Sequence, residues 1–109
     1  MRERSGDRLA IKDLYIDETV NFMASLAKRA IVVIDGVERE YTIYRTNKTE
    51  RKVKHFVYLT NEQGTVSSAR LLDGQGRELQ TRGFSVKKGA DGLVVTFVVE
   101  LNLIEVKEG

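Results

Sequence analysis

The hydrophobic pattern of the chain changes once, near residue 30, from a helical period to a strand period. Before this point, apolar side chains recur every three or four residues, at Ile16, Val20, Met23, Ala27 and Ala30. This spacing places them on one face of a helix and predicts a helix over residues 9–30. Residues 1–8 are rich in charge and contain Gly6, so we expect them to fray.

After the helix, runs of β-branched or alternating residues are separated by turn residues. Asp35-Gly36 follows the run 31–34 and is typical of a tight hairpin turn, because both of its positions need a positive φ. Further strands are predicted over residues 37–45, 53–60, 65–73, 77–84 and 93–106. The expected fold is mainly β (α+β), with one N-terminal helix and about six antiparallel strands in a small β-sandwich or open barrel. Its strands occupy residues 31–107 of a single domain, 1–109, that contains no proline.

The last predicted strand, residues 93–106, is unusually long. Its odd positions are apolar up to Leu103, and its even positions are polar only in the middle of the run. At about 3.3 Å per residue it would span roughly 45 Å, whereas a usual strand has about five or six residues. We expect its first part to close the core and its later part to contact another protein, through Leu101, Leu103, Ile104 and Val106.

The composition is that of an ordinary globular protein, with 41% hydrophobic and 31% charged residues. The chain has no cysteine, which excludes disulfides, a thiolate nucleophile and cysteine-based zinc sites. Its charged N-terminus is not followed by an apolar stretch typical of a secretory signal. No run approaches the roughly 20 apolar residues of a membrane helix. We therefore expect a soluble protein that is cytoplasmic when synthesised and has no membrane partner.

The net charge is +2, from 18 basic and 16 acidic residues. Nucleic-acid-binding proteins normally present a basic stripe, and the nearest candidate is the basic patch formed by Arg45, Lys48, Arg51, Lys52 and Lys54. Glu50 interrupts this patch, and Thr46, Asn47 and Thr49 are typical of a turn. The pattern favours a solvated hairpin tip over a nucleic-acid site.

Candidate catalytic groups are few. His55 is the only histidine, and it shares a predicted strand face with Val53 and Val57, which favours a structural role over that of a general base. No serine lies in a Gly-x-Ser-x-Gly motif. Gly74 and Gly76 lie in a predicted hairpin and lack the third glycine of a dinucleotide-binding motif. These patterns predict a protein that is not an enzyme, with no catalytic residue, cofactor or metal site.

Four aromatic residues, Tyr41, Tyr44, Phe56 and Tyr58, lie on adjacent predicted strands. If exposed together, they would form a platform for a sugar ring or a base. Cross-strand aromatic pairs more often stabilise the sheet itself, by about 0.2–1 kcal/mol each. The packing interpretation is favoured, and a ligand platform is the alternative.

The order of segments resembles one family. A helix end runs directly into a β-branched strand and turn at residues 28–36 (KRAIVVIDG), and residues 41–44 (YTIY) follow. Residues 69–79 (ARLLDGQGREL) and 86–97 (VKKGADGLVVTF) complete the pattern. From about residue 13 onward, the chain is similar to small proteins encoded among the tail and baseplate genes of phages and prophages of Gram-positive bacteria. The resemblance implies a non-enzymatic structural or accessory tail component that acts by binding other proteins.

Proteins of this group often carry the label ketopantoate hydroxymethyltransferase, which the size of the chain contradicts. That enzyme class is a (β/α)₈ barrel of about 250 residues, whereas this chain has 109 residues and a single predicted helix. The resulting hypothesis is a tail protein that forms a homo-oligomer, or docks on a larger tail or baseplate protein, and so becomes virion-associated. A carbohydrate-binding module that recognises a host surface through exposed tyrosines is the alternative, and a nucleic-acid-binding module is the third hypothesis.

Overall fold

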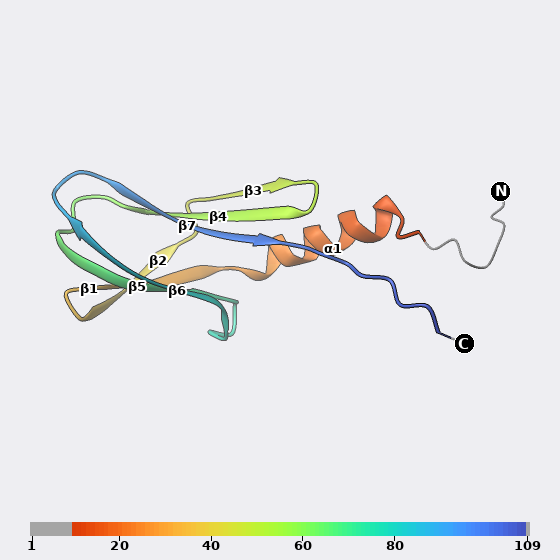
Figure 1. Cartoon of the computed structure of the whole chain (residues 1–109). Coiled ribbons are helices and arrows are strands. Elements are labelled where there is room, and N and C mark those ends of the chain that lie inside the picture. Colours follow the sequence, from red (N-terminus) through yellow and green to blue (C-terminus); the bar gives the residue numbers. More distant parts are fainter. Residues whose placement is uncertain (1–9, 109) are drawn as a thin grey trace.

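The computed structural model describes residues 10–108 and arranges them as one helix and two antiparallel sheets (Figure 1). In chain order the elements are α1 (Asp13–Leu26), β1 (Arg29–Ile34), β2 (Val37–Thr42), β3 (Arg45–Thr49), β4 (Lys52–Leu59), β5 (Gly64–Leu72), β6 (Glu78–Lys88) and β7 (Leu93–Glu100). One sheet has the strand order β2-β1-β5-β6 and the other the order β3-β4-β7. The predicted mainly β fold is confirmed, and the two sheets form a small sandwich that is not closed into a barrel.

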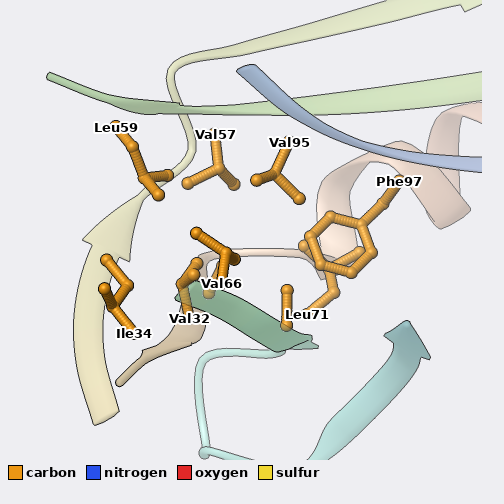
Figure 2. Close-up of a cluster of buried hydrophobic side chains, with 10 residues drawn as sticks. Val32, Ile34, Val57, Leu59, Val66, Leu71, Val95 and Phe97 are labelled. Carbon is orange, nitrogen blue, oxygen red and sulfur yellow. The ribbon is translucent and has the colours of Figure 1, made fainter. Parts of the chain in front are cut away.

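The inner faces of the two sheets meet in one apolar core. Figure 2 shows side chains of β4 and β7 pointing toward side chains of β1 and β5; they are Val57, Leu59, Val95 and Phe97 on one side and Val32, Ile34, Val66 and Leu71 on the other. Alternate residues of a strand point to the same side, so a strand that is apolar at every second position buries one face. Phe97 is the largest fully buried side chain.

The first hairpin forms at Asp35-Gly36, as predicted. Asp35 has a φ of 51° and Gly36 a φ of 77°, the positive values that this turn requires. The Asp35 carboxylate also accepts a hydrogen bond from the backbone N–H of Thr65, at 2.8 Å, and so links the turn to β5. A Cβ on Gly64 would lie 2.3 Å from the Asp35 carboxylate, and Gly64 has a φ of 138°, so only glycine fits there.

The predicted strand over residues 37–45 is wrong in its extent. β2 ends at Thr42, and the chain then crosses to the other layer, where Arg45 begins β3. The side chain of Ile43 packs against the core at this crossing. β3 contains the residues predicted as a turn, because they pair with β4, and the turn lies instead at Glu50 and Arg51. This additional strand gives seven strands within residues 10–108, where about six were predicted.

The predicted strand over residues 93–106 is too long. β7 ends at Glu100, which pairs with Lys52, the first residue of β4. Beyond this pair the Leu101 N–H donates to the Arg51 carbonyl, at 2.7 Å. The β3–β4 turn then ends the neighbouring strand, and a strand cannot continue without a partner for its backbone groups. Residues 101–108, here named the C-terminal segment, have no regular secondary structure.

The helix is shorter than the predicted range of residues 9–30. α1 begins at Asp13 and ends at Leu26, and Arg29 already belongs to β1. The Lys28 N–H donates to the Leu72 carbonyl, at 2.8 Å, so the chain passes directly from the helix into the sheet. Residue 9 and the predicted frayed segment 1–8 lie outside the described residues.

The molecule is elongated. Its radius of gyration is 18.5 Å and its extents are 61 × 25 × 23 Å, whereas a compact chain of roughly 100 residues has a radius of gyration of about 13 Å. The helix, the tip of the β3–β4 hairpin and the C-terminal segment extend from one end of the sandwich (Figure 1). The helix is anchored there by Ile16 and Val20, which are buried in a cluster with Val53 of β4.

Replacement of Phe97 by alanine tests the assignment of the inner face. It removes a fully buried ring, so we expect the free energy of unfolding to fall by about 3–5 kcal/mol. The control Val98→Ala, on the outer face of the same strand, should change it by about 0.5 kcal/mol or less, because Val98 is 43% exposed. Urea denaturation followed by circular dichroism measures both, and equal losses would contradict the assignment.

Candidate interaction surface

Helix α1 carries apolar side chains on two faces, and only one of them is covered. Ile16 and Val20 are buried against β4. Leu14, Tyr15 and Phe22 are 71%, 66% and 62% exposed. Tyr15 and Phe22 lie about two helical turns apart, so they point the same way. A helix that is apolar on both sides is normally buried on both sides, and this second face therefore has the character of a contact surface.

The structure divides the four predicted interface residues into two pairs. Leu101 and Leu103 are partly buried and pack on the cluster formed by Ile16 and Val20. Ile104 and Val106 are 77% and 72% exposed. The first pair attaches the C-terminal segment to its own domain, and the second is accessible to another molecule. The interface role of all four residues stays a prediction.

An apolar groove of about 350 Å³ opens where the helix and the two sheets meet. Five elements contribute to its walls, with Met23 and Leu26 from α1, His55 from β4, Leu71 from β5, Leu79 and Gln80 from β6, and Val99 from β7. Its volume lies near the lower end of the range for ligand sites, about 300–1,000 Å³. His55 and Gln80 are the polar members of an otherwise apolar lining.

The groove lies at the seam between β6 and β7, which are edge strands of different sheets. Side chains of β6 bridge this seam. The Arg82 Nη1 donates to the Thr96 carbonyl at 2.6 Å, and the Gln80 Nε2 donates to the Val98 carbonyl at 3.1 Å. These two carbonyls of β7 therefore point away from β4 and would otherwise have only solvent as a partner.

The two edge strands differ in regularity. The register of β6 with β5 shifts twice, and such irregularities make an edge strand a poor partner for further pairing. β7 pairs with β4 in an unbroken register from Leu93 to Glu100. β7 is therefore the edge at this seam that is better suited to accept another strand.

The four predicted platform residues do not lie together. Tyr44 and Tyr58 are exposed neighbours whose ring centroids are 5.7 Å apart and tilted by 42°. Phe56 is half-buried on the same face and lies 5.9 Å from the Arg45 guanidinium. Tyr41 belongs to the other sheet and packs against the core. The structure thus brings three of the four side chains to one face.

Tyr41 has a structural contact of its own. Its hydroxyl donates to the Glu62 carboxylate at 2.5 Å. Burial, together with this hydrogen bond, raises the pKa of Tyr41 far above its ordinary value. The same hydrogen bond lowers the pKa of Glu62. The buried Lys88 ammonium stabilises the loop that contains Glu62, because it donates hydrogen bonds to the carbonyls of Thr60, Glu62 and Gly89.

The basic patch is divided between two faces of the β3–β4 hairpin. Lys48 faces the helix, where its ammonium donates to the Asn21 side chain at 2.7 Å. On the other face, Arg45 lies opposite Phe56, and Lys54 lies opposite Asn47. Arg51 is in the turn and Lys52 begins β4. Strand alternation therefore prevents the five side chains from forming one continuous surface.

His55 lies on the inner face of β4, where alternation predicts it. It is 3% exposed, and its Nδ1 lies 2.9 Å from the Thr46 hydroxyl oxygen. Burial lowers the pKa of the imidazole below its ordinary value. The residue lines the groove and at the same time joins β4 to β3.

Several residues of this surface were not predicted. Leu14, Tyr15 and Phe22 lie outside the helical stripe that predicts the core, although the spacing of Tyr15 and Phe22 is itself a helical signal. Leu79, Gln80 and Arg82 were not predicted either, because their partners lie on the other sheet. No local pattern identifies contacts of that kind.

Within residues 10–108, no helix is long and apolar enough to span a membrane. In the same range, no cluster of three or more histidine or carboxylate side chains is arranged to hold a metal ion. Comparisons of the chain with protein families, with curated proteins and with solved structures find no match. The surface described above is therefore the basis on which a function is proposed.

The lowered pKa of His55 makes stability depend on pH. Because the folded-state pKa lies below the unfolded value of 6.5, the unfolded state binds the proton more readily. Stability is then complete above about pH 7 and falls as the pH decreases through 6.5, by at most about 1.4 kcal/mol per pH unit. Urea midpoints between pH 7.5 and 5 should fall less for His55→Gln than for the natural chain. Identical slopes would contradict this role for His55.

Proposed function

We propose that the chain is a non-enzymatic structural component of a phage or prophage tail, and that it acts by self-association or by docking on a larger tail protein. The observation that carries the proposal is the exposed apolar surface of an elongated molecule, on the second face of α1 and, separately, at the pair Ile104 and Val106. The tail context comes from the resemblance in segment order described above.

The energetics of this surface support a contact with protein. Each large apolar side chain that leaves water contributes about 1.5–3 kcal/mol, and the helix alone exposes Leu14, Tyr15 and Phe22. Contiguous apolar surface beyond the needs of the core is typical of sites where proteins associate. The charged residues between them, such as Glu18, keep the free chain hydrated.

The substitution Phe22→Glu tests the proposal. It places a charge in the middle of the second helix face, so we expect the weight-average mass from light scattering at micromolar concentration to fall. The control Val37→Glu introduces the same charge at another exposed apolar position (54% exposed), in the β1–β2 hairpin, and should leave the mass unchanged.

Circular dichroism would verify that both variants stay folded. The proposal fails if the natural chain is strictly monomeric at these concentrations and also captures no neighbouring tail protein in a pull-down. If Phe22→Glu and Val37→Glu reduce the mass equally, the second face of α1 is not the specific contact surface, and a different surface must be sought.

A carbohydrate-binding module is the second candidate, because Tyr44 and Tyr58 form an exposed aromatic pair on one sheet. Aromatic faces of this kind stack on sugar rings. On a glycan array, Tyr44→Ala and Tyr58→Ala should each abolish any signal, whereas Tyr41→Phe should retain it because Tyr41 lies on the other sheet. An array without a signal for the natural chain would remove this candidate.

A further inference from the structure

The seam between β6 and β7 offers both parts of a strand-addition site. An extended segment that joins a sheet edge gains main-chain hydrogen bonds along the edge, and pockets for alternate side chains provide specificity. At β7, the Thr96 and Val98 carbonyls point outward and accept hydrogen bonds from side chains of β6. Beside them, the apolar groove begins at Val99.

The C-terminal segment has the pattern of the incoming strand. Leu101 and Leu103, at odd positions of the segment, pack on the helix of the same chain. The apolar residues of the other parity, Ile104 and Val106, are exposed. In an extended chain, two such side chains lie about 6.6 Å apart on the same side, a spacing that suits two neighbouring positions in one groove.

The segment cannot serve the groove of its own chain. Val99 is part of the groove wall, and the chain leaves this wall at once along α1, away from the sandwich (Figure 1). Contact of Leu101 and Leu103 with the helix maintains that direction. The groove that Ile104 and Val106 can reach therefore belongs to another molecule.

Charge agrees with this pairing. Arg82 borders the seam and forms no ion pair among residues 10–108. In the C-terminal segment, Glu108 shares the parity of Ile104 and Val106 and points to the same side of an extended strand, whereas Glu105 and Lys107 point to the opposite side. A strand that replaces Arg82 on the Thr96 carbonyl frees the guanidinium for a carboxylate of that same strand.

From these observations we infer that the C-terminal segment of one copy adds as a strand to the β7 edge of a second copy, with Ile104 and Val106 in the groove at the β6–β7 seam. The inference rests on the proposed self-association and names one contact for it, which is separate from the second face of α1. The carbonyls of Thr96 and Val98 then accept hydrogen bonds from the backbone of the added strand instead of from the β6 side chains. The added strand also covers Leu79 and Met23.

The natural chain has no cysteine, so engineered pairs report this contact directly. Leu79→Cys and Ile104→Cys are made as two separate full-length variants and mixed under mild oxidation. A disulfide requires Cα atoms within about 7 Å, so a mixed dimer should form several-fold faster than in the control mixture of Val37→Cys with Ile104→Cys. Val37, Leu79 and Ile104 are all exposed in the single chain, and the variants should fold.

Charge reversal provides a second readout. Glu108→Lys in the Ile104→Cys chain should slow formation of the mixed disulfide several-fold, and Arg82→Glu in the Leu79→Cys chain should restore it. Restoration separates a specific pairing from a general loss of association. A reversal that slows the reaction in both steps, with no rescue, would overturn the placement of Glu108 beside Arg82 and with it the direction of docking.

The outcomes separate the inference from the proposed function. If the natural chain self-associates but the Leu79 and Ile104 mixture forms disulfides no faster than the control, the inference is overturned and the proposed function stands. If the natural chain is monomeric and no mixed disulfide forms, self-association fails together with the inference.

Discussion

Strands β1, β4, β5 and β7 each bury one apolar face, and this constraint governs how the rest of the chain is arranged. Strands with a single apolar face can cover one another only as two facing layers. The chain therefore changes layer between β2 and β3, between β4 and β5 and between β6 and β7. The space between the layers is filled by side chains such as Phe97 and Val57, and it has no room for the helix. α1 consequently packs outside the sandwich, through Ile16 and Val20, and its second apolar face has no layer to cover it.

The sequence predicted elements whose determinants are local. The Asp35-Gly36 turn and the inner position of His55 follow from turn chemistry and strand alternation alone. Elements whose limits depend on distant partners were predicted less well. β7 stops at Glu100 because β4 begins at Lys52, and no residue near position 100 signals this. β3 is a strand because β4 supplies its hydrogen bonds, although its composition is typical of a turn. The exposure of Ile104 follows from parity, whereas the seam contacts of Gln80 and Arg82 depend on the packing of two sheets.

The seam shows how an edge strand can be protected from further pairing although no other strand is bound to that edge. Side-chain donors from β6 satisfy two carbonyls of β7, which makes chance pairing with another chain less favourable. Exchange of these donors for a backbone N–H leaves the number of hydrogen bonds nearly unchanged, and a hydrogen bond contributes only about 0.5–1.5 kcal/mol net. The free energy of the proposed contact must then come mainly from burial of Ile104 and Val106, about 1.5–3 kcal/mol each. Ordering of the end of the C-terminal segment opposes this gain, so the net contribution of one contact is small.

A contact of this strength would be weak between two isolated copies and strong within a closed assembly. The proposed strand addition joins unlike surfaces, so each copy is both donor and acceptor. Such a heterologous contact produces a ring when the rotation closes and a filament when it does not. In a ring, the last contact forms between ends already held together, so its effective concentration is high and the small gain per contact is multiplied. The second face of α1 is a different surface, which stays free for a second set of contacts. If the second faces of α1 from two rings contact each other, the rings stack in pairs. If this face instead contacts a larger protein, the ring binds to that protein. Either arrangement would join several copies of the chain around an axis, as the proposed role in a tail assumes.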